Sequence, residues 1–360
     1  MSIKEIAYAA KQQLELETLQ SFSHSHVHEL LAACFGYKSK AALHSSCVFV
    51  VMSEPMTIST EHALVLRRRL VELGYKSVDE RAGAALLQTV EMHRLGVIEV
   101  DAILSVFDPL RDEDTAWEAE SWDAEDLSDD SNQAWAAGEH GLDLSSMGLL
   151  ISELEDVARK NHLKAHQALV FIYRSMMHEV GSGSEHWYSA LLQGASLTGV
   201  QLEWAHAYGQ SQLFAQREAY HLQEAARLGC SHCRLELVHA AALEAEEKMD
   251  FEGAKRCYLD AATLGDTQAM RVLIHNYDSE NVFQNWVWIH LSRLLGDDLR
   301  QSSLRAYHDG GLYHGQEYDD DQGGPLYVAG DEGVELPDMS ADKQLEASRI
   351  AEEMFKKLVS

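Results

Sequence analysis

The chain of 360 residues exceeds what one small core organises, and its 46% hydrophobic residues with only four prolines allow most of it to be ordered, chiefly as helix. Its 58 acidic and 29 basic residues give a net charge of −29, which disfavours nucleic acid and anionic membranes as partners because both carry negative phosphates. The five cysteines lack framework spacing, the N-terminus lacks the apolar core of a signal peptide, and no apolar run approaches the roughly 18 residues of a membrane span, so the sequence predicts a cytoplasmic protein.

Residues 1–110 are expected to form a small helical N-terminal module whose charge is nearly balanced. Residues 1–100 carry ten Lys and Arg against eleven Asp and Glu, so almost all of the negative charge lies further along the chain. Apolar positions at helical spacing predict helices at Lys4–Leu19, His26–Phe35, Lys40–His44, Glu61–Leu73, Val78–Leu95 and Glu99–Phe107. The helix at Val78–Leu95 has the clearest boundaries, because Ser77 and Glu80 fit a capping box and Gly96 fits a C-terminal cap.

Two features of this module are compatible with binding a partner. Residues 26–44 have the spacing of a helix-turn-helix, with Gly36 at the turn. Arg67, Arg68 and Arg69 could contact phosphates or an acidic protein surface, although the triplet is equally compatible with a solvated helix face. The alternative to a protein scaffold is therefore a regulator whose N-terminal helical module binds nucleic acid.

Residues 111–145 are an acidic segment that separates the module from the rest of the chain. Between Asp112 and Asp143 there are twelve acidic residues and no Lys or Arg, a composition that favours a flexible linker. Three tryptophans are interleaved with the acids, and large aromatic side chains are costly to leave in water. They are Trp117, Trp122 and Trp135. Both a plain linker and a segment that orders on a partner remain open.

A repeated pattern begins at about residue 146. Short helical motifs end in Gly194, Gly229, Gly265 and Gly296, at spacings of 35, 36 and 31 residues. A glycine after the last turn of a helix supplies the left-handed cap of a helical hairpin, and Asn161 can take the same role less readily. The pattern predicts helices at Leu150–Lys160, Phe214–Leu228, Ser231–Glu246, Glu252–Leu264, Thr267–Tyr277 and Phe283–Leu295.

Two of these segments, AKRCYLDAATLGDTQAMRVL (Ala254–Leu273) and YHLQEAARLGCSHCRLELV (Tyr220–Val238), resemble Sel1-like repeats, which are related to tetratricopeptide repeats. The resemblance covers roughly residues 146–307, and a helix after residues 337–340 resembles the cap that closes such arrays. It implies an all-α protein in which residues 146–360 form an α-solenoid of helical hairpins. It also implies a protein-binding concave face, because family members serve mostly as adaptors without chemistry of their own.

The sequence offers no set of residues for catalysis, a cofactor or a metal. Cys230 and Cys233 supply only half of a zinc site, so they are interpreted as packing residues. The run Asp319–Gly324 resembles a calcium loop in composition but lacks the closing glutamate. The loop Asp309–Leu336 that contains it is long and carries Tyr313 and Tyr318, and long loops within compact domains are often functional.

Together these observations predict a non-enzymatic protein-interaction scaffold or adaptor with an acidic surface and a basic protein partner. One version is a bacterial defence or immunity protein that captures a foreign protein. Self-association is left open. The residues predicted to contact a partner are Arg67, Arg68, Arg69, Trp117, Trp122, Trp135, Tyr313 and Tyr318.

Overall fold

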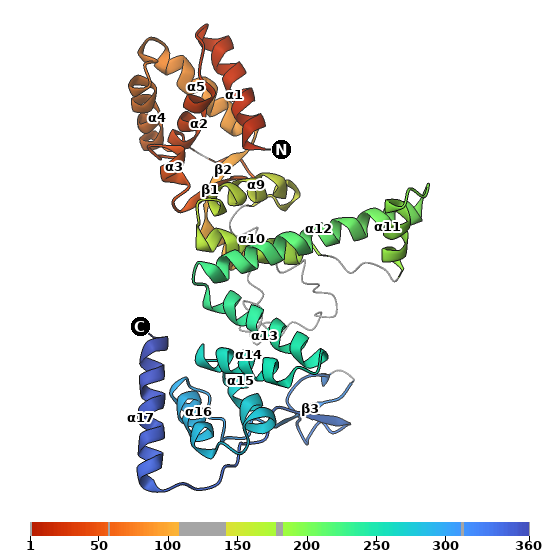
Figure 1. Cartoon of the computed structure of the whole chain (residues 1–360). Helices are drawn as coiled ribbons and strands as arrows, with labels where there is room; N and C mark the ends of the chain where they lie inside the picture. The colour runs from red at the N-terminus through yellow and green to blue at the C-terminus, as the bar shows by residue number, and fades with distance from the viewer. Residues whose placement is uncertain (1, 57, 108–141, 178–182, 311–312, 360) are drawn as a thin grey trace. The chain divides into compact units, whose positions relative to one another are not determined.

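A computed structural model describes residues 2–56, 58–107, 142–177, 183–310 and 313–359 (Figure 1). The described chain is predominantly helical and divides into two compact units, Met1–Cys230 and Ser231–Ser360. The division lies inside the range 146–360 that the sequence analysis assigns to one repeat array. Among the described helices, none is both long and apolar enough to cross a lipid bilayer.

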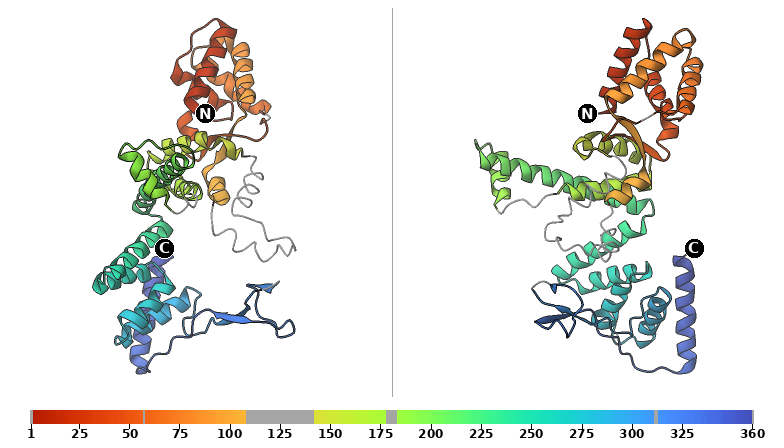
Figure 2. Two further views of the ribbon diagram at one scale, coloured as in Figure 1. Left: turned by 90° about the vertical axis from the view of Figure 1, so that its right-hand side faces the viewer. Right: turned by 180° about the vertical axis from the view of Figure 1, so that it is seen from behind.

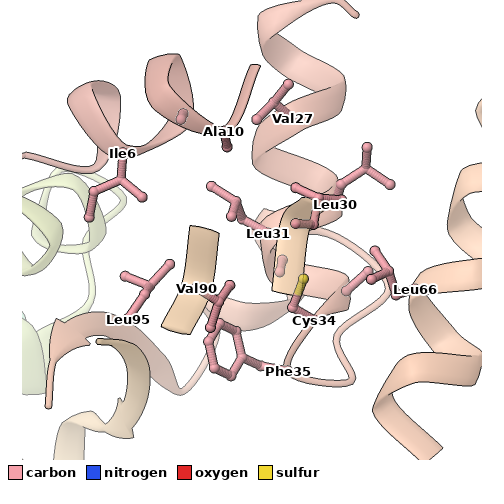
Figure 3. Close-up of a cluster of buried hydrophobic side chains, with 14 of the residues drawn as sticks. Ile6, Ala10, Val27, Leu30, Leu31, Cys34, Phe35, Leu66, Val90 and Leu95 are labelled. Atoms are coloured by element: carbon pink, nitrogen blue, oxygen red, sulfur yellow. The ribbon is translucent and has the colours of Figure 1, made fainter. Parts of the chain in front are cut away.

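The N-terminal helices pack around one core, shown in Figure 3. They are α1 (Ile3–Thr18), α2 (His24–Ala33), α3 (Lys40–Leu43), α4 (Thr60–Glu72), the 3-10 turn η1 (Lys76–Val78) and α5 (Asp79–Met92). The next helix, α6 (Val100–Phe107), contributes no residue to this core. Fully buried Ile6, Leu30 and Leu66 bring α1, α2 and α4 together. Leu149 of the later helix α9 (Met147–Ala158) joins the same core, so the core extends beyond the N-terminal hundred residues.

A two-stranded antiparallel sheet, absent from the sequence analysis, lies between these helices. Strand β1 (Cys47–Val51) pairs with β2 (Leu95–Glu99). The boundaries predicted for the helix at Val78–Leu95 are wrong. Helix α5 has Val78 as its N-cap residue, without a side-chain capping bond, and ends at Met92, and Gly96 is a residue of β2. The apolar runs that form β1 and β2 are short, and the periodicity of such short runs does not distinguish a strand from a helix.

The second half of the first unit is built from α9, α10 (Leu163–Ser175), α11 (Ser184–Leu192) and α12 (Val200–Arg227), preceded by the 3-10 turn η3 (Leu144–Ser146). α9 packs on β1 and on α10, and α12 packs on α10 and α11. The sequence pattern predicted no helix at α10, placed a helix end at Gly194 without giving the start of α11, and started α12 at Phe214. Gly209 of α12 is why α11 approaches so closely, since an added Cβ there would lie 2.7 Å from the Tyr188 ring.

The predicted glycine corners are confirmed at all four helix ends. Gly194, Gly229, Gly265 and Gly296 have φ of 87°, 104°, 97° and 95°. At each corner the next residue donates its N–H to the carbonyl five residues earlier, as from Cys230 to Ala225 at 2.9 Å, which is the bond of a Schellman cap. Asn161 has φ 61° and ends the α9 segment in the same left-handed conformation.

The second unit is a row of helices in which each packs on the next. They are α13 (Ser231–Glu247), α14 (Phe251–Thr263), α15 (Thr267–Val272) with its π-helical continuation η4 (Leu273–Tyr277), α16 (Val282–Leu294) and α17 (Ala341–Leu358). Tyr258, Met270 and Trp288 lie in its core. The predicted C-terminal helix is confirmed, and its buried Ala347 and Ala351 face that core.

Between α16 and α17 the chain forms an antiparallel ribbon of β3 (Arg305–His308) and β4 (Leu326–Ala329). The expectation of a loop across residues 309–336 is therefore wrong for β4. Figure 2 shows the ribbon extending away from the helices of its own unit. The pairing is hard to recognise in the sequence because a long Gly-rich, acidic segment joins the two strands in place of a tight turn.

Candidate functional site

The first unit contains a pocket of about 320 Å³, here called the α12 pocket. It is lined by Glu155, Ala158, Arg159, His166, Leu213, Gln216, Arg217, Tyr220 and His221. These residues come from the end of α9, the start of α10 and the C-terminal half of α12. The α10–α12 contact therefore positions most of its side chains.

Two buried imidazoles form the floor of the α12 pocket. The Nδ1 atoms of His166 and His221 lie 2.9 Å apart, and Nε2 of His166 lies 3.0 Å from the carbonyl oxygen of Ala158. A carbonyl only accepts, so Nε2 of His166 carries the proton and, in the neutral ring, its Nδ1 is an acceptor. His221 consequently donates from Nδ1, which leaves its Nε2 as a hydrogen-bond acceptor.

Burial keeps these imidazoles neutral. It lowers the pKa of His166, and together with the neighbouring His166 and Arg217 it lowers the pKa of His221 to about 4. Only 2% of His166 and 5% of His221 are exposed, so both rings lie almost entirely out of water. At neutral pH the floor is an uncharged polar surface.

Three residues of the pocket lining, Glu155, Arg217 and His221, contact a tyrosine of α10, Tyr173, which is not itself part of the lining. The Tyr173 ring stacks on His221 at 5.9 Å between centroids, and its hydroxyl donates to Glu155 at 2.8 Å. Arg217 also donates to Glu155. Burial and the Glu155 carboxylate raise the pKa of Tyr173 to about 12, so the phenol stays protonated and continues to donate.

The rim of the pocket is exposed and partly apolar. Leu213 and Tyr220 are 47% and 55% exposed. With Arg217 they recur at positions i, i+4 and i+7, which places all three on one face of α12. Tyrosine and arginine are enriched among the residues that contribute most to protein–protein binding energy. The arrangement offers an anchoring surface of aromatic, aliphatic and hydrogen-bonding groups.

A smaller polar pocket of about 310 Å³ lies in the second unit. Trp286 donates from Nε1 to the carbonyl of Pro337 at 3.0 Å, and the Arg300 guanidinium lies over its ring at 5.3 Å. His290 is hydrogen-bonded to Gln344 at 3.1 Å. These contacts join α16 to the segments beside it, so their first role is to hold the unit together.

Across the described residues, no group of three or more His, Cys, Asp or Glu side chains is arranged to hold a metal ion. Cys230 and Cys233 are both buried, as expected of packing residues.

Two arginines of the triplet pair with carboxylates of the N-terminal module. Arg67 pairs with Asp79 at 2.7 Å, and Arg69 pairs with Glu29 at 3.3 Å. Arg68 is exposed. Because two of the three charges already face carboxylates, the triplet presents less free positive charge than its sequence indicates.

The other predicted contact residues divide into two groups. Trp117, Trp122 and Trp135 lie outside the described residues. Tyr313 and Tyr318 flank the buried imidazole of His308, with ring centroids 5.7 and 4.7 Å from it, and so pack at the end of the ribbon where β3 leads into the connecting segment.

Sequence reasoning missed the α12 pocket altogether. His166 and His221 are 55 positions apart, and α10, which carries His166, was not predicted. The available signal was the spacing of Leu213, Arg217 and Tyr220, which places an aliphatic, a basic and an aromatic side chain on one face of a helix.

No protein-family model matches this chain, no curated protein matches its sequence significantly, and no solved structure matches it significantly.

Proposed function

We propose that this chain is a cytoplasmic, non-enzymatic scaffold that binds a protein partner. The observation that carries the proposal is the α12 pocket: an exposed rim of Leu213, Arg217 and Tyr220 above a floor of uncharged imidazoles. A rim of this composition resembles the anchor region of a protein interface. It presents binding groups without a nucleophile activated by a neighbouring base.

The proposal includes an α-solenoid of Sel1-like hairpins over residues 146–360. Its support is the recurrence of the same Schellman corner at spacings of 35, 36 and 31 residues, from Gly194 to Gly296. Equal corners give successive hairpins similar geometry, which is the requirement for stacking repeats.

A net charge of −29 favours a partner with a basic surface, because complementary charge accelerates encounter and like charge opposes it. A narrower form of the proposal is a bacterial defence or immunity protein that captures a foreign protein. Both forms use the same test.

The full chain is tagged, crosslinked in its cells of origin and purified, and the bound proteins are identified by mass spectrometry. The identified partner is then titrated calorimetrically against wild type, Tyr220→Ala and the matched control Leu16→Ala, which removes an exposed leucine of α1. Loss of an anchor residue is expected to weaken binding by roughly tenfold or more, whereas the control stays near wild type.

Equal binding by Tyr220→Ala and Leu16→Ala would remove the α12 pocket from the proposal. If the tagged chain instead co-purifies with nucleic acid that a nuclease removes, and with no protein, the result supports the alternative of a regulator that binds nucleic acid. Weakening by salt is expected for a basic partner, since ionic screening reduces attraction to the acidic surface.

A further inference from the structure

The ribbon of the second unit has one covered strand and one open strand. β3 is hydrogen-bonded on both edges: it pairs with β4, and on its other edge His308 donates to Gln316 at 2.9 Å and Ala306 accepts from Tyr318 at 2.8 Å. β4 therefore forms the free edge of this small sheet.

The register identifies which main-chain groups of β4 point away from β3. Asp309 donates to Pro325 at 2.9 Å and Ser303 donates to Asp331 at 3.0 Å. In antiparallel pairing, bonded and non-bonded residue pairs alternate, so Leu326 and Val328 occupy non-bonded positions. Their N–H and C=O groups face outward, and in the described part of the chain no backbone group pairs with them.

The open edge is also apolar. Leu326, Tyr327 and Val328 are 45%, 40% and 59% exposed, and all four residues of β4 are classed as exposed. Proteins usually protect a free edge with charged side chains, proline or a covering segment, because an open edge pairs readily with another strand. β4 has none of these within its four residues, and Figure 2 shows the ribbon extending away from the helices of its unit.

The charge around the edge selects the occupant. Residues 303–332 contain seven Asp and Glu and a single basic residue, Arg305, which itself lies 3.9 Å from Glu317. A second copy of the ribbon would bring the same negative charge, and so would residues 112–143 of this chain. Like charges repel both arrangements, whereas a lysine- or arginine-rich strand is attracted.

We propose that β4 is a docking edge that adds an extended basic segment of a partner protein as a new strand of the ribbon. Main-chain bonds to Leu326 and Val328 supply the pairing, as in other cases of strand addition. Exposed β4 side chains contact apolar residues of the segment, and acidic groups contact its basic residues. This inference deepens the proposed protein-binding function and rests on it.

The test uses the full chain and a fluorescent peptide of alternating lysine and valine, with an alternating glutamate and valine peptide as the charge control. Val328→Pro removes the outward-facing backbone N–H without removing a hydrogen bond between β3 and β4. Val328→Thr keeps that backbone N–H and has a side chain of similar shape. Anisotropy is expected to show peptide binding that Val328→Pro weakens at least roughly tenfold and Val328→Thr leaves within about twofold.

Equal affinity of the two variants, or equal binding of the two peptides, overturns the proposal. A wild-type dimer in sedimentation experiments that Val328→Pro dissociates also overturns it, because the occupant is then a second copy.

Amide hydrogen exchange of the wild type provides a readout that does not depend on the folding of a variant. Saturating lysine–valine peptide is expected to slow exchange at Leu326 and Val328, whereas unchanged exchange there rejects the docking edge. If the chain captures a protein through the α12 pocket but exchange at these amides is not slowed, only the docking-edge proposal is refuted. If exchange at these amides is slowed but the chain captures no protein, only the scaffold proposal is refuted.

Discussion

His221 gives the first unit a sensitivity to acid. Its pKa is about 4 in the folded chain and 6.5 in the unfolded chain, so the unfolded state takes up the proton first as pH falls. The contribution of this group is constant above about pH 7, and between 6.5 and 4 it reduces stability by at most about 1.4 kcal/mol per pH unit. The lowered pKa of His166 acts in the same direction.

We therefore expect His221→Asn to flatten the pH dependence of unfolding. The asparagine amide retains a donor near the position of imidazole Nδ1 but does not titrate in this range. Urea unfolding of the first unit at a series of pH values from 4.5 to 8 measures the slope, with the values above pH 7 as an internal control. Identical slopes for the two proteins below pH 6 would show that His221 does not set this behaviour.

Glu153 is a buried carboxylate that contacts one lysine and one histidine. It is fully buried, accepts from His44 at 2.8 Å and pairs with Lys40 at 3.2 Å, which joins α3 to α9. Lys160 lies 3.3 Å from Nδ1 of the same histidine and extends the network.

Removing the Glu153 carboxylate is expected to be costly. Glu153→Ala leaves Lys40 and His44 without their acceptor, and breaking one side of a buried pair typically costs about 3–5 kcal/mol. The matched control is Asp156→Asn, whose partly exposed carboxylate lies 3.9 Å from Lys40 and is expected to contribute less than about 1 kcal/mol. Chemical denaturation compares the two, and a loss for Glu153→Ala no larger than the control contradicts the argument.

At the level of elements, the helix ends at the repeated glycines were predictable from the sequence, whereas the capping-box and glycine signals at Val78–Leu95 misplaced the ends of α5, and buried short segments were missed. The glycine corners fix φ, so Gly229 and Gly265 identify helix ends directly. Strand β1 was missed because its five residues are all buried and carry no alternation that separates strand from helix, and the five residues of β2 are too few to show a clear period. The end of α11 was predicted at Gly194, but its packing on α12 was not, because that contact depends on Gly209, whose role is visible only in three dimensions.

Two glycine substitutions should change stability in opposite directions. Gly229 has φ 104° with open space around it, so Gly229→Ala places a side chain in the left-handed region at a cost of about 1 kcal/mol. Gly83 lies within α5 with nothing near an added Cβ, so Gly83→Ala is expected to stabilise by about 0.5–1 kcal/mol. Both residues belong to the first unit, and its urea midpoint measures both effects. Shifts of the same sign would contradict this assignment of the corner.

For the whole molecule, the separate hydrophobic cores of the two units predict that each unit unfolds in its own transition. Ile6 and Leu30 belong to the core of the first unit, and Met270 and Trp288 to that of the second. Glu153→Ala is expected to lower the melting temperature of one transition, and Met270→Ala that of the other, because truncating a buried methionine costs about 2–5 kcal/mol. Differential scanning calorimetry of the full chain follows both. A single transition moved by either substitution would show that the units unfold together.

The candidate sites were less predictable than the fold. Composition and repeated glycines indicate a predominantly helical chain, and Tyr313 and Tyr318 lie beside His308 at the end of the ribbon where β3 leads into the connecting segment. The α12 pocket requires His166 and His221 to meet across 55 positions, which no local pattern specifies. The free edge of β4 requires the strand register, which follows only from its partner β3.

The outward-facing peptide groups of Leu326 and Val328 have a consequence for how a partner could evolve. Peptide groups are the same in every residue except proline, so the main-chain bonds of this edge depend only on the spacing and extension of a strand, and the acidic groups around it constrain only the charge of the strand. A partner could therefore change many of its side chains and still bind, as long as its strand stays extended and basic.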